Sequence, residues 1–489
     1  MKLGQKVAAF GVCVALIIGA AGFGGSTEGP AAPRHDERPE LGPVAPLSND
    51  GRWFTDATGR VVLLHGVNEV FKSAPYYPAA DAFGPDDAKF LAGKGFNTVR
   101  LGINFLGLMP EPGQIDYQYI ENIATSVRDL ARRRIFVLLD FHQDGFAPKY
   151  NGNGLPDWMG IDDGLPNPPD AVFPLYYVQN PAMQRAFESF WSNRAGPDGI
   201  GIQDHYIDGL RAVAERFADD PYVMGYELMN EPWPGATWQP CVFGPAEECA
   251  ALEQERLVPF HQKATAAVRE ITQTQGVYVE PFVLFNFGMV GTTLPGADSD
   301  DILSFHSYAV DVGGEQGVVD NAVAAAERDD RPLIETEFGA TMDVPTLQRL
   351  TGQVDDALVS WQFWAYREEL VSERELPASL ATVRDVAVLQ ALNTPYPAAT
   401  TGTPTSAHFD PATRIYDLAY DTVGPSGQTY PRTLDTVVSI PNLQYRHGYT
   451  VEVTGAKVSS APCSTRLTLR NRAGAAQVTV RITPGGRCR

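Results

Sequence analysis

Short apolar runs alternate with longer amphipathic stretches between residues 53 and 366. The runs are rich in Val, Ile, Leu and Phe, whereas stretches such as Tyr119–Arg134 and Tyr206–Phe217 have the hydrophobic period of helices. Repeated strand and helix units of this kind are typical of a parallel sheet. The expected strands are Val61–Asn68, Thr98–Asn104, Ile135–Phe141, Val223–Glu227, Phe282–Phe287, Ile302–His306, Leu333–Glu337 and Trp361–Trp364.

Eight parallel strands, each followed by a helix, close into a (β/α)8 barrel, which we expect over residues 51–394. A doubly wound open sheet is the alternative, but no glycine-rich dinucleotide turn supports it. Beyond Pro395 the texture changes to Thr, Pro and Gly clusters with alternating runs, which predict antiparallel strands at Thr450–Val453, Thr465–Leu469 and Gln477–Ile482. The predicted fold class is therefore α/β, a TIM barrel with a C-terminal β-sandwich at residues 395–489.

The amino terminus has the pattern of a signal peptide over residues 1–25. Two lysines precede an apolar run from Val7 to Phe23 that is too short to be a typical membrane span, and small residues follow it. An uncleaved anchor is the alternative. Residues 26–50 are rich in Pro, Gly and charge and are expected to form a linker. We therefore expect a secreted, extracellular protein.

Four cysteines remain once Cys13 is removed with the leader: Cys241, Cys249, Cys463 and Cys488. An even number in an oxidising compartment favours disulfides. Proximity favours Cys241 with Cys249 and Cys463 with Cys488, although three pairings are possible. No metal site is expected, because there is no close Cys-x-x-Cys pair and no nearby His cluster. The net charge of −21 argues against a nucleic-acid partner, and names no other.

Polar residues collect where the expected strands end. A barrel gathers these carboxyl ends around one mouth, where the catalytic groups of such folds lie. Two carboxylates facing each other there would suit glycoside cleavage, one as the acid and the other as the nucleophile or base. The candidate site residues at or near the strand ends are Lys72, Arg100, His142, Asp144, Asn230, Glu231, His306, Tyr308, Glu337 and Trp364.

We assign the acid role to Glu231, because an apolar setting beside Trp233 would keep it protonated. Glu337 is the candidate nucleophile, kept ionised by Arg100 and Tyr308. Carboxyl groups about 5 Å apart predict retention of configuration, and about 6.5 to 9.5 Å predicts inversion. Glu335 is the alternative carboxylate, since strand alternation would point it the same way as Glu337.

The ordered set Arg100, His142, Asn230-Glu231, His306, Tyr308, Glu337 and Trp364 resembles the signature of family 5 glycoside hydrolases. Four segments are more closely similar to the endoglycoceramidase branch, secreted enzymes that release whole glycans from glycosphingolipids and that pair a barrel with a β-sandwich. These segments are His65–Lys72, Asp140–Asp144, Leu175–Tyr177 and Asp219–Pro232.

The resemblance implies that Glu231 is the acid/base and Glu337 the nucleophile, and that Asn230 hydrogen-bonds the sugar 2-hydroxyl. It places Lys72, His142, Asp144, Tyr308 and Trp364 on the glycone side. Glu335 departs from the family, which has an uncharged residue there. The short interval between the two catalytic glutamates favours the galactosylceramide-cleaving type. We expect no cofactor, a monomer, and transient contact with a membrane or micelle.

Structural roles remain open for several of these residues. His142 and His306 could be satisfied core histidines, Arg100 a buried ion-pair partner, Lys72 and Asp144 exposed charges, and Trp364 core filling. The segment Phe146–Trp191 could likewise pack its aromatic side chains or expose them to lipid. The lipid-facing candidates are Trp158, Met159, Phe173, Tyr176, Tyr177 and Phe187.

Two other functions fit the same residues. The first is a polysaccharide endo-β-glycanase of the cellulase or mannanase type on the same barrel. The second, from another class, is a non-catalytic protein that binds glycan or lipid, although both carboxylates are present.

Overall fold

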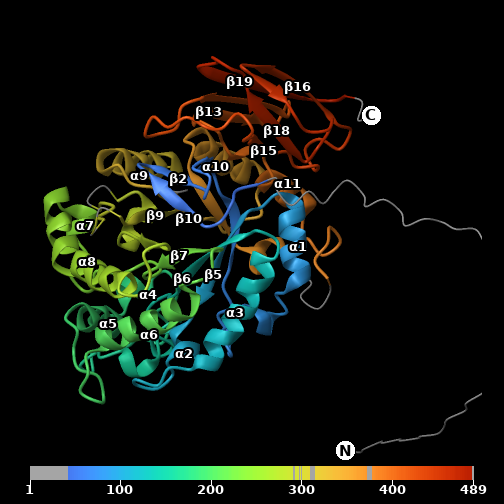
Figure 1. The fold of residues 1–489 in the computed structure, drawn as a ribbon. Coiled ribbons are helices and arrows are strands. Elements are labelled where there is room, and N and C mark those ends of the chain that lie inside the picture. Colours follow the sequence, from blue (N-terminus) through green and yellow to red (C-terminus); the bar gives the residue numbers. More distant parts are fainter. Residues whose placement is uncertain are drawn as a thin grey trace, which may run out of the picture. The chain divides into compact units, whose positions relative to one another are not determined.

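The centre of the fold is a closed parallel barrel of eight strands. The computed structural model describes residues 42–289, 292–296, 298, 300–308, 314–371 and 377–486. Around the barrel the strands run in the order β10-β11-β4-β5-β6-β7-β8-β9 (Figure 1). The strands are β4 (His65–Glu69), β5 (Thr98–Ile103), β6 (Phe136–Phe141), β7 (Val223–Glu227), β8 (Gly276–Val279), β9 (Ile302–Ser307), β10 (Leu333–Gly339) and β11 (Ser360–Trp364). The expected (β/α)8 barrel is confirmed.

Helices cover the outside of the barrel and bury their apolar faces against it. The longer ones are α1 (Pro85–Lys94), α3 (Tyr117–Ala131), α5 (Pro181–Trp191), α6 (Ile202–Phe217), α8 (Ala246–Arg269), α9 (Glu315–Asp329), α10 (Val344–Asp356) and α11 (Val386–Leu392). Asp116 caps α3 by accepting a hydrogen bond from the amide of Tyr119, a typical helix start. Asp343 caps α10 in the same way.

The fifth strand lies earlier in the chain than the sequence indicates. We expected it at Phe282–Phe287, but Val283–Phe287 is the 3-10 helix η4 and the strand is β8, Gly276–Val279. Both segments are short and apolar, and length and periodicity do not separate a buried strand from a buried helical turn. Pro281 lies between them, a residue that cannot donate to a strand ladder. As a consequence, Glu280 is the residue at the carboxyl end of this strand.

A buried apolar cluster closes the amino-terminal end of the barrel. Inward side chains such as Leu138, Tyr278 and Ile334 form one buried cluster there with Phe54 and Leu47. Phe54 comes from a small antiparallel sheet of β1 (Ser48–Asp50), β2 (Trp53–Thr55) and β3 (Val61–Val62). The prediction of a linker up to residue 50 is wrong at its end, because β1 pairs with β2. The predicted signal peptide and most of the linker lie outside the described residues.

Two four-stranded antiparallel sheets form the C-terminal β-sandwich. One sheet has the order β12-β15-β18-β17 and the other β13-β14-β19-β16. Side chains from both sheets, including Tyr416 and Leu469, share one buried core. The strands are β12 (Tyr396–Ala399), β13 (Thr403–Asp410), β14 (Ile415–Asp421), β15 (Thr436–Ser439), β16 (Tyr449–Thr454), β17 (Ala456–Val458), β18 (Arg466–Asn471) and β19 (Gln477–Pro484). The three strands expected from alternation correspond to β16, β18 and β19.

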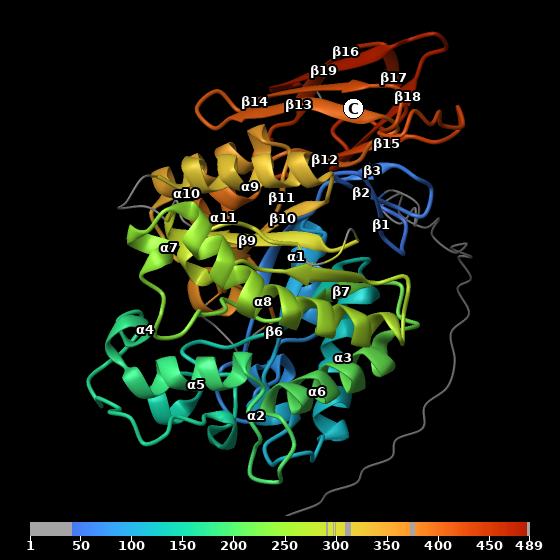
Figure 2. The same cartoon turned by 90° about the vertical axis from the view of Figure 1, so that its left-hand side faces the viewer.

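Barrel and sandwich meet through stacked rings and a buried ion pair. His65 at the start of β4 lies between the rings of Trp361 and Tyr396, with centroids 4.3 and 3.7 Å away. Arg60 pairs with Asp56 at 2.7 Å and donates to the Asp435 carbonyl at 2.9 Å. Strand β13 lies beside α10 (Figure 2). These contacts lie where β4 begins, at the end of the barrel opposite the strands' carboxyl ends.

One of the two expected disulfides lies within the described residues. Cys241 and Cys249 are bonded, and they join α7 (Pro240–Phe243) to the first turn of α8. The expected partner of Cys463, Cys488, lies outside the described residues. Within the described part of the chain, none of the helices combines the length and apolar character needed to cross a membrane.

Candidate active site

Arg100 is the centre of the polar cluster at the carboxyl ends of the strands. It lies on β5 and is fully buried. Its guanidinium is 2.5 Å from Glu227 and 2.5 Å from Glu337, and also donates to Asn230 at 2.7 Å and Asn68 at 3.0 Å. A buried guanidinium needs this many partners, because an unpaired buried charge is costly. Four strands and the loop after β7 are thereby connected at the barrel mouth.

Glu231 and Glu337, 106 positions apart in the chain, face each other in this cluster. Glu231 follows β7 and Glu337 lies on β10; both are buried. The Nδ1 atom of His306 is 2.9 Å from Oε1 of Glu231 and 3.5 Å from Oε2 of Glu337. One carboxylate oxygen from each glutamate and a ring nitrogen of His306 lie within 4.8 Å of one another. This spacing matches the separation of about 5 Å that accompanies retention of configuration in glycosidases.

The surroundings of the two glutamates differ. Burial, and then the negative charge of Asp144, raises the pKa of Glu231 to about 7. Burial also raises the pKa of Glu337, but His306 and Arg100 oppose this rise, and Tyr308 donates a hydrogen bond to Oε2 at 3.0 Å. A carboxyl with a pKa near neutrality can donate a proton, whereas one that faces a guanidinium is favoured in its charged form.

A second group of predicted residues lies at one side of the mouth. The ammonium of Lys72 is 2.7 Å from Asp144 and lies 4.4 Å from the centre of the Trp364 ring. Trp364 stacks on His142, with ring centroids 5.4 Å apart. Burial alone would lower the pKa of His142, but the nearby carboxylates of Asp140 and Asp144 raise it to about 9. A charged, partly exposed pair beside an aromatic ring can bind sugar hydroxyls and a sugar face.

Glu335 does not point the same way as Glu337, contrary to the expectation from strand alternation. On the neighbouring strand β9, Glu335 pairs with Phe305 whereas Glu337 pairs with His306, so β10 has one extra residue between them. This β-bulge breaks the alternation. Phe305 packs outward against Phe285, and Glu335 lies on the same side, where it accepts a hydrogen bond from Ser307. Glu335 is therefore a buried carboxyl beneath the helices, near Glu315.

Three residues that hydrogen-bond Glu231 were not in the predicted set. Glu280 accepts a hydrogen bond from the amide of Glu231, and Asn286 donates one to Oε1 of Glu231 at 3.0 Å. Both follow β8, and they were not predicted because the fifth strand was expected at Phe282–Phe287 and its carboxyl end was therefore misplaced. Gln143 donates to the carbonyls of Asn230 and Glu231 at 2.8 and 3.0 Å. Its position directly after His142 in the predicted strand end was the available signal.

The aromatic segment after β6 is divided between core and surface. Of its predicted lipid-facing residues, Met159, Tyr176, Tyr177 and Phe187 are buried, and Trp158 packs against the core. For these five residues the alternative of core packing therefore holds. Phe173 is 59% exposed, and its exposed apolar neighbours are Val172, Leu175 and Val178. The ring of Tyr177 lies 5.0 Å from that of Trp233, two residues after Glu231, and its hydroxyl accepts from the Gly145 amide, so this segment lies beside the site.

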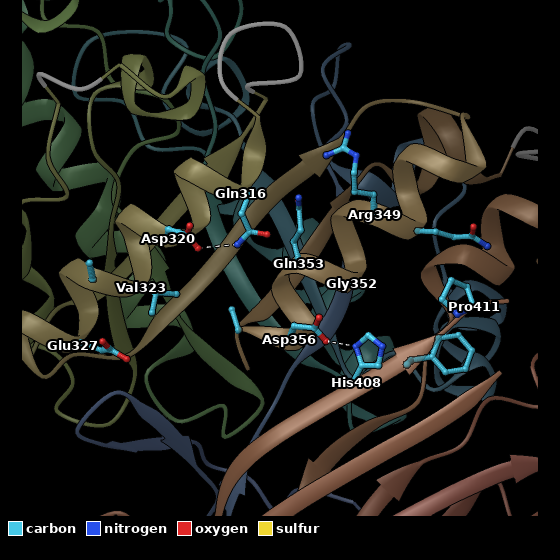
Figure 3. A pocket seen from close by; sticks show the side chains of 14 residues that line it. Gln316, Asp320, Val323, Glu327, Arg349, Gly352, Gln353, Asp356, His408 and Pro411 are labelled. Carbon is cyan, nitrogen blue, oxygen red and sulfur yellow. Dashed lines mark hydrogen bonds and ion pairs between the residues drawn. The ribbon is translucent and has the colours of Figure 1, made fainter. Parts of the chain in front are cut away.

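A groove of about 630 Å³ is separate from this cluster (Figure 3). It is lined by α9, α10 and β13, and two pairs of its polar groups bond each other, Gln316 with Asp320 and His408 with Asp356. These elements lie on the outside of the barrel and in the sandwich, whereas Glu231 and Glu337 face the barrel interior.

Glu231, His306 and Glu337 also have the donor atoms of a metal site. In this arrangement the guanidinium of Arg100 already supplies a positive charge 2.5 Å from Glu337. Tyr308 donates to the other oxygen of the same carboxylate. Both oxygens of Glu337 therefore have donors from the protein itself.

Two family models match the barrel and the C-terminal domain. The model "Cellulase (glycosyl hydrolase family 5)" matches residues 55–369, and the "Glycoside hydrolase family 5 C-terminal domain" matches residues 395–483. The chain belongs to glycosyl hydrolase family 5. It is therefore a glycoside hydrolase, and the resemblance seen in its strand-end residues is confirmed.

Endoglycoceramidases are among the proteins that this chain resembles over most of its length. Endoglycoceramidase I of Rhodococcus hoagii is 34% identical over 91% of this chain and 89% of its own length. The structure of endo-glycoceramidase II from Rhodococcus sp. as a ganglioside GM3 complex is 27% identical, with a TM-score of 0.69 over 89% of this chain and all of that chain. Its lactosyl-enzyme intermediate is also 27% identical, with a TM-score of 0.68 over 88% and 99%.

Proposed function

We propose that this protein is a secreted, retaining endoglycoceramidase. It hydrolyses the β-glycosidic bond between glycan and ceramide in glycosphingolipids, and releases intact oligosaccharide and ceramide. The observation that carries the proposal is the pair of buried carboxylates of Glu231 and Glu337, which approach within 4.8 Å at the mouth of a family 5 barrel. The likeness to endoglycoceramidases over 91% of the chain supports the substrate class.

In the first step Glu231 donates its proton to the glycosidic oxygen while Glu337 attacks the anomeric carbon. The bond between sugar and ceramide breaks, ceramide leaves as an alcohol, and a glycosyl ester forms on Glu337. In the second step the Glu231 carboxylate takes a proton from water, the water oxygen attacks the anomeric carbon, and Glu337 is released. Two inversions give net retention. The lactosyl-enzyme intermediate of the Rhodococcus sp. enzyme supports this course.

The surrounding residues orient the reacting groups and hold the sugar. Arg100 and Tyr308 donate to opposite oxygens of Glu337 and so direct its carboxylate. Asn230, held by Arg100, hydrogen-bonds the sugar 2-hydroxyl. On the glycone side, the ion pair of Lys72 with Asp144 binds hydroxyls, and His142 and Trp364 form the adjoining wall.

The exposed apolar residues near the mouth form a contact with a membrane or micelle surface. Val172, Phe173, Leu175 and Val178 lie in one short segment, and all are more than 40% exposed. The rings of Phe173, Tyr176 and Tyr177 contact one another in sequence and lead from this surface toward Trp233, beside Glu231. A ceramide leaving group requires an apolar surface of this kind beside the scissile bond.

A substrate panel tests the activity. Purified protein is incubated with glucosyl- and galactosylceramide-linked glycosphingolipids and, separately, with soluble β-glucans and mannans, and products are identified by mass. Release of intact glycan and ceramide is the expected result, and the linkage cleaved faster establishes the sugar preference. Cleavage of glucan or mannan alone would replace the proposal with a polysaccharide endo-glycanase.

The lipid contact is tested with Phe173→Asp against a matched control. Val458→Asp makes the same kind of change at an exposed site in the sandwich, where Val458 is 40% exposed. Phe173→Asp should slow turnover of glycolipid in vesicles and leave turnover of a soluble aryl lactoside unchanged, whereas Val458→Asp should alter neither. Equal vesicle turnover by both variants would contradict the contact.

Secretion and oligomeric state each have a direct measurement. Protein recovered from culture medium should begin after about residue 25, as a signal peptidase would leave it. Light scattering should give the mass of one chain. Retention of residues 1–25 in the cell membrane, or the mass of a dimer, would contradict these parts of the proposal.

A further inference from the structure

Glu280 is a buried carboxyl that the proposed reaction does not use. It is the residue directly after β8 and is 2% exposed. Its Oε2 accepts a hydrogen bond from the backbone amide of Glu231 at 3.1 Å and lies 3.5 Å from Nε2 of His306. Its Oε1 is 3.4 Å from Arg100. Glu280 therefore contacts three members of the site, Glu231, His306 and Arg100.

The backbone of Glu231 needs such a contact. Its φ is +45°, in the left-handed region that residues with a side chain rarely adopt. A conformation of this kind costs free energy, and it persists where the surrounding structure holds it. Three groups hold it here: Gln143 donates to the Glu231 carbonyl, Asn286 donates to its side chain, and Glu280 accepts from its amide. Of these, Glu280 is the one that binds the amide hydrogen.

The charge balance around Arg100 indicates which form Glu280 takes. Asp140, Glu227, Glu280 and Glu337 all lie within 3.4 Å of this one guanidinium, and Glu280 is the most distant of the four. Burial, and then the charge of Glu227, raises the pKa of Glu280 well above its usual range, although Arg100 opposes the rise. The charges of Glu231 and Glu337, which also face Glu280, raise its pKa further. A neutral carboxyl relieves this excess of negative charge.

We propose that Glu280 is a positioning residue that holds, in its neutral form, both the backbone of Glu231 and the ring of His306. The carboxyl accepts from the Glu231 amide and donates its own proton to Nε2 of His306. This leaves the hydrogen of the neutral imidazole on Nδ1, between the two glutamates. His306 is itself neutral near pH 7, because burial lowers its pKa to about 4. This inference rests on the proposed function, since it assigns Glu231 as the acid.

The test compares leaving groups, because an acid matters only where the leaving oxygen needs a proton. We expect Glu280→Ala to lower kcat/KM for lactosylceramide by roughly 100-fold, the size of effect that a small misplacement of a catalytic group can produce. For 2,4-dinitrophenyl β-lactoside, which leaves without protonation, the loss should stay under about fivefold. Equal losses on both substrates would overturn the proposal in favour of a merely structural role.

Glu280→Gln tests the neutral form. A carboxamide has the same shape, and with its oxygen at the position of Oε2 it accepts from the Glu231 amide but cannot donate to His306, so kcat/KM should fall by less than in Glu280→Ala. The basic limb of the pH profile should also stay in place. If Glu280 were ionised, removing its charge would lower the pKa of Glu231 and move that limb to lower pH, which would contradict the proposal.

Glu253→Gln is the matched control. Glu253 is also a buried carboxyl with a pKa raised by burial to about 7, but it lies on α8 and bonds Thr293. This variant should keep the wild-type ratio of the two kcat/KM values, and thermal unfolding identifies any variant that fails to fold. Wild-type protein that cleaves the aryl lactoside but no glycolipid would refute the substrate class alone, and a series of aryl lactosides with poorer leaving groups would still test Glu280.

Discussion

Acidic side chains are buried both inside the barrel mouth and outside the strands among the helices, with different surroundings. Inside the mouth, Glu231 and Glu337 share His306, and Glu337 also contacts Arg100. Outside, beneath the helices, Glu335 accepts from Ser307 and Glu253 from Thr293. Burial raises the pKa of each of these four carboxyls. A raised pKa therefore does not identify the reactive groups.

The difference lies in which groups surround each carboxyl. The outer ones bond neutral hydroxyl and amide groups, which lower the pKa less than burial raises it, so burial favours the protonated acid. The inner ones face a guanidinium, an imidazole and one another, so that their charges can change during a reaction without a large rearrangement. The following predictions compare the two faces, beginning with the largest effect.

Glu337→Gln should abolish hydrolysis, with a loss on the order of 10⁴-fold in kcat, since the carboxamide cannot form the glycosyl ester. Stability should change little, because the shape is kept. Steady-state kinetics on lactosylceramide and on the dinitrophenyl lactoside measure this, and both substrates should be affected. Retention of a tenth of wild-type activity would exclude Glu337 as the nucleophile.

Glu231→Ala should give a loss of about 10² to 10⁴-fold on glycolipid, the usual contribution of a general acid. With the dinitrophenyl lactoside the glycosyl-enzyme should form at nearly the wild-type rate and then accumulate, since water lacks its base. A pre-steady-state burst of dinitrophenol detects this, and added azide should restore turnover. Absence of both burst and rescue would count against the acid/base assignment.

The pH dependence should follow Glu231. Its carboxyl must be protonated in the first step, and its pKa is raised to about 7, so kcat/KM for glycolipid should fall as the pH rises above about 7. The decline should approach tenfold per pH unit. The dinitrophenyl lactoside should lack this basic limb, and the same limb on both substrates would assign it to another group.

Glu335→Gln should leave catalysis unchanged and alter the pH dependence of stability. The pKa of Glu335 in the folded protein is raised to about 8, so between about pH 4.3, its unfolded value, and pH 8 the folded state binds more protons than the unfolded state. Wild-type stability thus falls with rising pH through this window, by up to about 1.4 kcal/mol per pH unit from this residue. Denaturant unfolding of both proteins should give a flatter curve for the variant.

Most of the fold could be predicted from the sequence because strand and helix periods are strong signals in long α/β chains. Val223–Glu227 is found as expected, and the limits of most other strands differ by at most two residues. The expected Val61–Asn68 begins four residues before β4, because its start forms β3 of the small antiparallel sheet. The fifth strand was misplaced because four residues at Gly276–Val279 are weaker in pattern than the apolar Phe282–Phe287. That single error also concealed Glu280 and Asn286.

The site residues on strand ends could be predicted, but their orientations could not. Arg100, Glu231, His306, Tyr308 and Glu337 meet as the barrel geometry requires. The direction of Glu335 depends on a bulge, which a single sequence does not reveal. Similarly, the segment after β6 is rich in aromatic residues throughout. Only their packing in the folded protein separates the exposed Phe173 from the buried Tyr177.

The extra residue in β10 has a consequence for any attempt to rebuild this site elsewhere. Strict alternation from the inward Ile334 would place residue 337 on the helix-covered side. The extra residue, Thr336, shifts the alternation of the strand, so that the Glu337 carboxylate turns toward the barrel interior while Phe338 packs in the core. A strand without Thr336 would keep every predicted site residue and still direct the side chain of residue 337 toward the helices.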